Sequence, residues 1–283
     1  MQQQSQSTLS IWLMALMAPM IWGTTYSVTQ RWLVGVDPFW LAALRISIPG
    51  CLMVWMVPKS VWIQFGWRIA LLSMLNIAIF TSLLFIAIGR LPGGIAATLV
   101  ATLPLQVIMI RAIFGIRPEM HHVFAAIGGV LGVACLVWQS TESLDLWGVV
   151  AALSASFIMA CGILLTARWI KDIPPLQFTS AQLFISGVVL LLYVILSGRE
   201  VPDITPSGVL ALAWLGPIGM GLGYWLWFRA MKAIPIQRLS FLGLVNPVVA
   251  VLVGVFFMSE EISTGQLFGM CLVLLCVVVG QRK

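Results

Sequence analysis

The sequence predicts an all-α integral membrane protein with ten transmembrane helices, arranged as two inverted five-helix repeats. Three observations carry this prediction: the composition, a series of ten apolar runs, and a match between the two halves of the chain. Hydrophobic residues make up 61% of the 283 residues and charged residues only 8%, whereas soluble domains carry about 25% charged residues. Lipid must therefore be the solvent for most of the surface, and ten crossings of about 20 residues each leave only short connections.

The apolar runs define the elements in order. The first run is too long for the core of a signal peptide and has no basic residue before it, so we interpret it as the first helix. The second run contains the single charged side chain well inside an apolar stretch, Arg45, and the third contains Asn76 near its centre. The fourth and ninth contain Pro104 and Pro247, and the eighth is rich in glycine, which favours close packing and kinking. We expect helices at residues 9–28, 38–57, 69–88, 94–110, 123–137, 146–165, 175–196, 207–228, 239–258 and 263–279.

The basic residues are distributed unevenly between alternate connections. Eleven lysines and arginines fall on the side that carries both termini, and three, Arg31, Arg90 and Arg199, fall on the other side. Cytoplasmic loops of membrane proteins carry the excess of Lys and Arg. The sequence therefore predicts a multi-pass protein of the bacterial inner (plasma) membrane with both termini in the cytoplasm.

The two halves of the chain match each other. Residues 85–104 align without a gap on residues 228–247, at an offset of 143, and a second match at an offset of 137 relates the first helix to the sixth. The repeating unit is therefore five helices, and we divide the chain into repeats 1–141 and 142–283. Because five is odd, the second copy enters the membrane from the opposite face, as in alternating-access carriers. The identical pairs in the first match include Ala87 with Ala230, Pro92 with Pro235, Leu99 with Leu242 and Pro104 with Pro247.

At these residues the chain resembles the EamA-type family of the drug/metabolite transporter superfamily. The resemblance rests on Trp22-Gly23, on Arg45, on the two matched prolines, and on a glutamate before a glycine-containing last helix in each half, Glu119 with Gly128 and Glu260 with Gly269. The stretches Leu75-Asn76-Ile77-Ala78, Leu91-Pro92-Gly93-Gly94 and Trp227-Phe228-Arg229 resemble the branch that contains pigment and metabolite exporters. The resemblance implies ten helices, inverted halves, and efflux of small metabolites such as amino acids, with helices 1, 3, 4, 6, 8 and 9 around the central pathway.

Polar and aromatic side chains near the middle of those helices are candidates for substrate contact. A side-chain amide in lipid is costly unless it is paired, so Asn76 and Asn246 should face substrate, water or a neighbouring helix. For Asn76, contact with substrate and a hydrogen bond between helices are the two alternatives. Trp22 and Tyr26 are one turn apart on the first helix and should present one stacking face.

Three further hydroxyl side chains are candidate substrate contacts or gates. Thr81 and Tyr224 are related by the offset of 143 residues, so we expect them at equivalent depths on either side of the membrane centre, as outer and inner gates. The alternative for Tyr224 is membership of an aromatic belt with Trp225 and Trp227. Thr102 is a weaker candidate, since threonine often hydrogen-bonds its own helix backbone.

Arg45 and its repeat partner Gln182 are candidate gating or structural residues. Either both make polar ties to nearby helix carbonyls, or Arg45 attracts an anionic group of the substrate near the outer mouth. Pro104 and Pro247 each remove one backbone hydrogen bond, which predicts a bend in both helices and a symmetric hinge.

The sequence predicts a carrier and not an enzyme. The only histidines, His121 and His122, are adjacent at the end of a predicted helix, and no carboxylate lies inside an apolar run, so groups for acid-base catalysis are missing. The five cysteines lack metal-ligand spacing, and we expect no cofactor and no metal. The expected partners are a small-molecule substrate and membrane lipid, without nucleic acid, in a monomer or homodimer. An amino acid or related zwitterion is the predicted cargo; the alternative is a multidrug exporter of amphipathic cations, attracted by aromatic rings.

Overall fold

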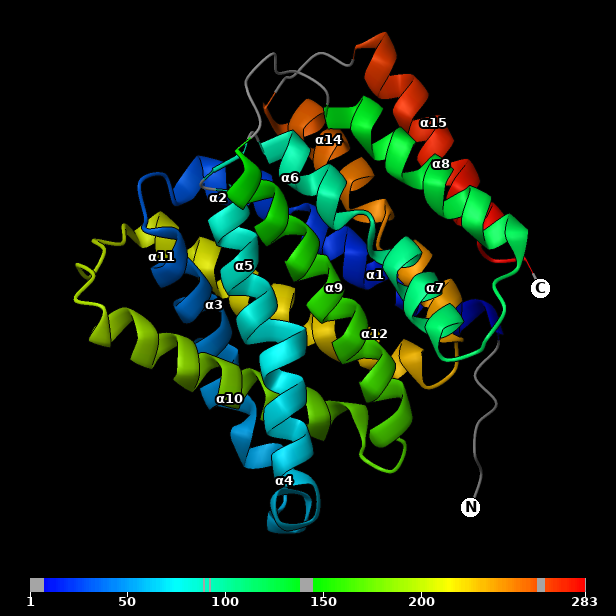
Figure 1. Ribbon diagram of the computed structural model, residues 1–283. Helices are drawn as coiled ribbons and strands as arrows, with labels where there is room; N and C mark the ends of the chain where they lie inside the picture. The colour runs from blue at the N-terminus through cyan, green and yellow to red at the C-terminus, as the bar shows by residue number, and fades with distance from the viewer. Residues whose placement is uncertain (1–7, 89, 92, 138–144, 259–262, 283) are drawn as a thin grey trace.

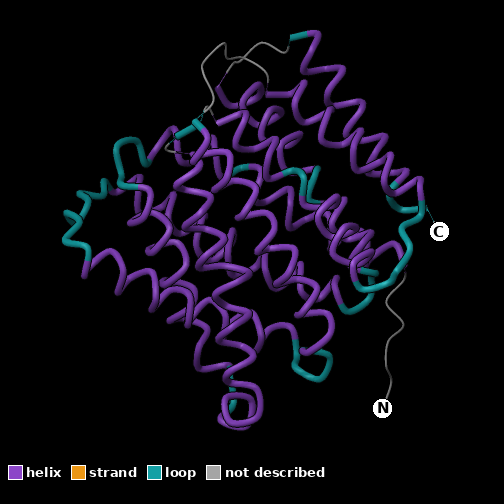
Figure 2. The backbone as a smooth tube through the Cα atoms, viewed as in Figure 1, coloured by secondary structure: helices purple, strands orange, loops and turns teal. Residues whose placement is uncertain are grey.

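The computed structural model describes residues 8–88, 90–91, 93–137, 145–258 and 263–282, and all regular secondary structure in those residues is helical (Figures 1 and 2). Pro92, which is part of the match between the halves, and Glu260, which is part of the family resemblance, lie outside the described residues. In chain order the elements are α1 (Thr8–Gly23), α2 (Thr25–Trp32), α3 (Pro38–Met53), η1 (Val54–Met56), α4 (Lys59–Ser73), η2 (Met74–Ala78), α5 (Ile79–Ile88), α6 (Gly93–Val100), α7 (Leu103–Ile113), α8 (Met120–Val137), α9 (Leu146–Trp169), α10 (Pro175–Leu196), α11 (Pro206–Ala213), η3 (Trp214–Leu222), α12 (Gly223–Met231), α13 (Ile236–Leu242), α14 (Val245–Met258) and α15 (Thr264–Val279).

The helical stretches match the lengths that a bilayer demands. Seven stretches of the described chain are long and apolar enough to cross the hydrocarbon layer, which needs about 20 residues. Three shorter apolar helices accompany them. The seven are Ser10–Thr29, Pro38–Met56, Lys59–Ile88, Leu146–Trp169, Pro175–Leu196, Pro206–Met231 and Ile236–Phe257, and the three are Thr98–Ile113, Met120–Cys135 and Thr264–Val279. The chain is therefore an all-helical, multi-pass membrane protein.

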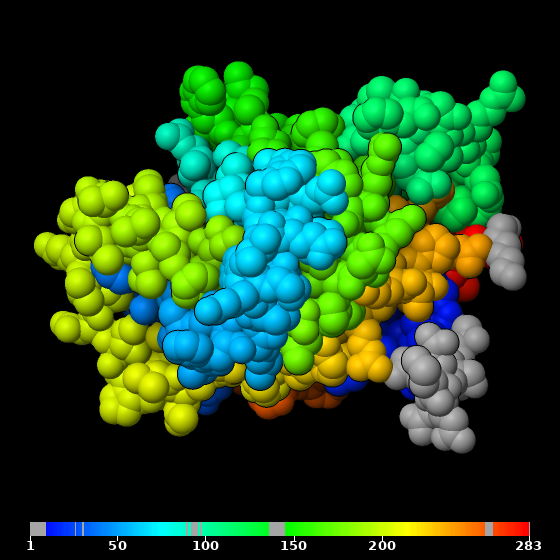
Figure 3. All heavy atoms as spheres, turned by 90° about the horizontal axis from the view of Figure 1, so that it is seen from below, coloured from blue at the N-terminus to red at the C-terminus, as the bar shows by residue number. Residues whose placement is uncertain are grey.

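The third helical stretch begins earlier than its hydropathy indicated. We expected a start at residue 69, but the helix begins at Lys59 and runs on through η2 and α5. Val61, Phe65 and Ile69 recur at four-residue intervals and are all buried, because residues at this spacing lie on one face of a helix. The polar residues between them concealed this extension, and α4 crosses the centre of the face shown in Figure 3 (light blue).

Helices of the first half pack against helices of the second half. α3 packs along α10, and α8 packs along α15, which lie side by side in Figure 1. α5 packs on α9, and α12 packs on α1. The two halves are thus interleaved and share one core.

Small residues allow this close approach. The helix interfaces bury Ala15, Ala43 and Ala160 completely, while Leu196 and Phe256 are 82% and 79% exposed. Lipid tails are as apolar as leucine, so membrane helices associate by close packing of small side chains, and large apolar side chains face outward.

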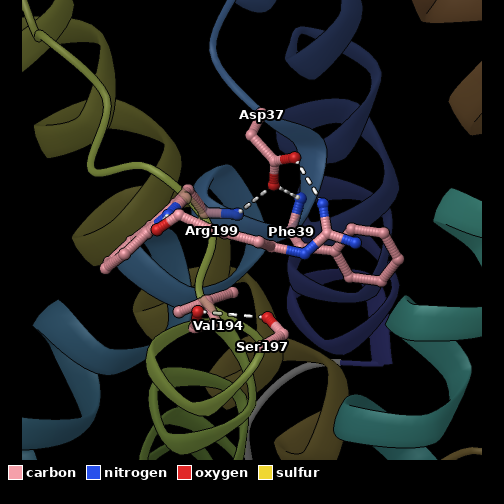
Figure 4. Close-up of polar contacts among 6 residues, drawn as sticks. Asp37, Phe39, Val194, Ser197 and Arg199 are labelled. Atoms are coloured by element: carbon pink, nitrogen blue, oxygen red, sulfur yellow. Dashed lines mark hydrogen bonds and ion pairs between the residues drawn. The ribbon is translucent and has the colours of Figure 1, made fainter.

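An ion pair joins the start of α3 to the end of α10 (Figure 4). The Asp37 carboxylate accepts hydrogen bonds from the backbone N–H groups of Phe39 and Trp40 and thereby caps α3. The same carboxylate lies 2.6 Å from Nη1 of Arg199, whose guanidinium stacks over the Phe39 ring at 4.3 Å. A side-chain hydrogen bond with Tyr193 is the main cause that raises the pKa of Arg199 above its ordinary value, and the charge of Asp37 raises it further. The pair fixes how the two helix ends meet.

Candidate functional site

Irregular helix segments occur at matched positions in the two halves. The π-helical stretch η2 covers Met74–Ala78, and the offset of 143 residues places it on 217–221, inside the π-helical stretch η3. π-Helical turns are rare and are frequent at functional sites. The glycine-rich composition of the eighth helix predicted its irregularity, whereas no sequence signal indicated η2.

A second pair of irregularities precedes the matched prolines. One helical stretch is interrupted at residues 101–102, between α6 and α7, and its counterpart at residues 243–244, between α13 and α14 (Figure 2). Pro104 and Pro247 lack the N–H that would bond the carbonyls of Val100 and Gly243, four residues earlier. The Ser156 hydroxyl of α9 donates to the Val100 carbonyl at 3.2 Å, and the Asn246 backbone N–H donates to Gly243 at 3.1 Å. Both freed carbonyls are therefore satisfied within the protein, as a membrane interior requires.

Trp22 lies against the irregular segment η3. Its indole Nε1 donates to the Gly219 carbonyl at 2.8 Å, and its ring lies 5.2 Å from Tyr224 and 5.6 Å from Trp227. In the opposite direction, Nε1 of Trp214 in η3 donates a hydrogen bond to the Thr24 hydroxyl at 2.9 Å. The first helical stretch breaks at that threonine. Two indoles therefore join the break between α1 and α2 to η3.

The predicted shared face of Trp22 and Tyr26 stays a prediction. Trp22 lies in the last turn of α1 and Tyr26 in the first turn of α2, and Thr24 between the two helices has a right-handed helical backbone. The side chain of Tyr26 lies outside the described residues. Gly23 permits the break to approach α14, because a Cβ atom there would lie 2.8 Å from the Asn246 carbonyl oxygen and 2.7 Å from Val249 Cβ.

Asn76 occupies a buried polar tie between three helices. Its Nδ2 donates to Thr166 Oγ1 of α9 and to Gln182 Oε1 of α10, each at 3.0 Å, and both Asn76 and Gln182 are 0% exposed. The Tyr224 hydroxyl contacts the Asn76 carbonyl at 3.4 Å. Of the two alternatives for Asn76, this conformation adopts the hydrogen bond between helices. Gln182 likewise bonds the Asn76 amide in place of the helix carbonyl that we expected.

Arg45 reaches the middle of the membrane-spanning stretch. Its Nη2 lies 3.3 Å from Sδ of Met220, and its side chain is partly buried. Met220 lies about 21 Å along the helix from Pro206 and about 16 Å from Met231, at 1.5 Å per residue. The guanidinium is therefore near mid-depth and is not drawn outward to the interface.

The remaining predicted residues are distributed around this region. Thr81 and Tyr224 are both 4% exposed. Thr102 lies at the break before α7, and its hydroxyl donates to the Leu99 carbonyl at 2.6 Å, so it hydrogen-bonds its own helix backbone. Asn246 is partly buried in α14, beside Gly23. The structure thus brings together Trp22, Tyr224 and Asn76, whereas Thr102 is engaged with its own helix.

A pocket of about 320 Å³ opens at the ends of α9, α10 and α12. Its lining includes Thr166, Phe178, Phe228 and Lys232. The Lys232 ammonium donates to the carbonyls of Lys171 and Ile173 at 2.9 and 2.6 Å. Partial burial lowers the pKa of Lys232 below its ordinary value, and Asp172 partly offsets this. Thr166 connects the pocket to Asn76, a role that no sequence pattern indicated.

Comparisons with known proteins agree with this architecture. The model of the EamA-like transporter family matches residues 9–138 and 146–279. Protein PecM of Dickeya dadantii is 33% identical over 274 residues, with 94% of this chain and 91% of that protein covered. The uncharacterized inner membrane transporter YedA of Escherichia coli K12 is 25% identical, covering 92% of this chain and 86% of YedA.

Two further similarities concern a more distant relative and the fold. A protein of Escherichia coli K12 named as a probable amino-acid metabolite efflux pump is 23% identical, with 93% of this chain and 91% of that protein covered. A solved crystal structure aligns with a TM-score of 0.82 at 20% identity over 97% of both chains. With matched irregular helices, a multi-pass helical fold and two family matches that span nearly its whole length, the chain belongs to the EamA-like transporter family, whose members are drug/metabolite-type membrane transporters.

Proposed function

We propose that this transporter exports an amino acid or related zwitterion across the bacterial inner membrane by alternating access. The carrier has ten transmembrane helices in two inverted repeats, 1–141 and 142–283, with both termini in the cytoplasm. The observation that carries the proposal is the mid-depth guanidinium of Arg45 beside η3, in a chain whose apolar stretches contain no carboxylate.

The inverted repeat is supported by paired irregularities and paired packing. The π-helical stretches and the breaks before Pro104 and Pro247 recur at corresponding positions. The packing is paired in the same way. α5 of the first half packs on α9 of the second half, and their repeat counterparts, α12 and α1, also pack on each other. Discontinuous helices at the junction of inverted repeats form the substrate sites of many carriers.

Alternating access needs two gates that close in turn. Thr81 and Tyr224 occupy corresponding positions and are both buried, and we assign them to the outer and inner gates. We assign the pocket lined by Thr166 as the inner vestibule. Asn76 lies behind its wall, where its amide donates a hydrogen bond to the Thr166 hydroxyl. Rocking at the two proline breaks opens one gate while the other closes.

The substrate class follows from charge and from aromatic surface. A guanidinium binds a carboxylate well, because charge-assisted hydrogen bonds are the stronger ones. Trp22 with Tyr224 offers a ring surface to the rest of the molecule, and Tyr26 and Asn246 complete the proposed substrate surface, whereas the Thr102 hydroxyl is engaged with its own helix. The relative from Escherichia coli K12 that is named as a probable amino-acid metabolite efflux pump agrees with this class.

A binding assay with matched ligands tests the assignment. Purified protein in detergent is titrated with amino acids, with the corresponding amides, which lack the carboxylate, and with organic cations. We expect amino acids to bind, and we expect Arg45→Gln to lower their affinity roughly 10- to 150-fold. This range corresponds to about 1.5–3 kcal/mol for a hydrogen bond to a charged group. Binding of the amides should not change.

Arg68→Gln is the matched control, since the Arg68 guanidinium lies over the Trp67 and Trp169 rings, neither of which belongs to the proposed substrate surface. It should keep wild-type affinity. Stabilisation by organic cations alone would favour the multidrug alternative and would contradict the proposal. Export of the bound amino acid from inverted vesicles or proteoliposomes then tests direction.

A further inference from the structure

We infer that the start of α8 holds a divalent transition-metal site, formed by Glu119, His121 and His122. The three ligand atoms all lie within 4.8 Å of one another. Nδ1 of His121 is 3.5 Å and Nδ1 of His122 is 3.9 Å from Oε2 of Glu119. The proposed transport mechanism uses none of these residues, and the family resemblance includes Glu119 only as the glutamate before a glycine-containing helix.

The spacing suits a shared metal ion better than a hydrogen bond. Hydrogen bonds from nitrogen to oxygen have lengths of about 2.7–3.2 Å, and both contacts are longer. Two ligands at about 2.0–2.1 Å from a tetrahedral zinc ion are roughly 3.3 Å apart. The side chains of Glu119 and His121 are accessible, so a small rotation brings their ligand atoms onto such a sphere.

The burial of His122 is the second, independent observation. Its side chain is only 5% exposed, yet Nδ1 has no hydrogen-bond partner. A buried polar group without a partner costs roughly 1–3 kcal/mol. A metal ion on Nδ1, which faces Glu119, removes that cost. The rings of His121 and His122 stack at 4.0 Å, which holds both Nδ1 atoms near the same carboxylate oxygen.

The neighbours of the site set its character. Phe241 lies 5.9 Å from the His122 ring, and the Gly280 backbone and the Arg238 guanidinium are its other neighbours. Imidazole with one carboxylate suits Zn²⁺, Ni²⁺ and Cu²⁺ better than Ca²⁺ or Mg²⁺. Arg238 opposes a cation, so the affinity is below that of a structural zinc site. Three protein ligands leave at least one position for water.

Metal titration of the full-length protein tests the inference. The protein is purified through a tag without histidine, treated with chelator, and titrated with Zn²⁺ by calorimetry and with Co²⁺ by absorption. We expect one ion per chain and a Co²⁺ spectrum of nitrogen and oxygen ligands. The chain has only two histidines, so imidazole resonances report this site alone, whereas its five cysteines would give a thiolate charge-transfer band.

Two variants decide between a site and chance proximity. His122→Gln and Glu119→Gln should each lower the affinity for Zn²⁺ by about tenfold or more, since loss of even a residue that only hydrogen-bonds a metal ligand has an effect of that size. Glu119 is 59% exposed, so its replacement keeps the fold even if the buried His122 variant does not. Glu200→Gln, at the other end of the molecule, is the control and should bind normally. Unchanged affinity in Glu119→Gln, a thiolate spectrum, or no binding at all would overturn the site.

Discussion

Replacing Asn76 by leucine tests the buried polar tie that joins α9 and α10 to η2. Leucine has the branched shape of asparagine but no polar atoms. The variant loses two hydrogen bonds, to Thr166 and to Gln182. It also leaves Gln182 without a partner for Oε1, and Nε2 of Gln182 already has none.

The expected cost follows from these contacts. Hydrogen bonds between membrane helices contribute about 0.6 kcal/mol each on average. A buried amide without a partner costs about 1–3 kcal/mol more. Leucine also removes Asn76 Oδ1, which is buried without a partner and offsets part of this cost. Asn76→Leu should therefore destabilise the protein by about 1–2 kcal/mol, and Thr166 loses little because its hydroxyl still donates to the Gly162 carbonyl.

A double-mutant cycle with Gln182→Met separates the two contributions. Methionine matches the length of glutamine and removes the stranded amide, so Asn76→Leu/Gln182→Met should be more stable than Asn76→Leu alone. Unfolding is followed in detergent by thermal denaturation, where the single variant should lower Tm by roughly 2–8 °C. Substrate affinity is measured on the fraction that remains folded.

One result would refute the structural interpretation. If Asn76→Leu unfolds like the wild type but no longer binds substrate, Asn76 contacts the substrate and the tie is incidental. A lower Tm with affinity retained within about twofold supports the tie. Additive losses in the double variant would mean that Asn76 and Gln182 do not interact.

Two further predictions concern packing and orientation. Gly23→Ala places a methyl group against backbone and Cβ atoms of α14, so it should destabilise the carrier by about 1–3 kcal/mol and reduce flux. Gly66→Ala, with nothing within 4 Å, should be neutral or slightly stabilising in the same melting assay. In a cysteine-free background, Glu200→Cys should react with an impermeant thiol reagent in intact cells, and Arg117→Cys only after permeabilisation. The reverse labelling pattern would invert the topology and exchange the two gates.

The sequence alone determined the class of the protein and the position of the two helix breaks that precede Pro104 and Pro247. Composition excludes a soluble surface, and the apolar runs coincide with helical stretches of the structure, although the third stretch begins at Lys59 and the first is divided at Thr24. Pro104 and Pro247 lack an N–H, and the structure interrupts both helices directly before them. These features could be predicted because each depends on a residue and its neighbours within one or two helical turns.

Only the tertiary structure decided which partner each polar side chain has. The Asn76 amide bonds residues 90 and 106 positions away, and the Trp22 indole bonds a carbonyl 197 positions away. The break at Thr24, which separates Trp22 from Tyr26, could not be predicted in this way because no proline follows it within the next turn. An amide or an indole specifies that a partner is needed in the membrane, but only the packing of distant helices determines which group is within reach.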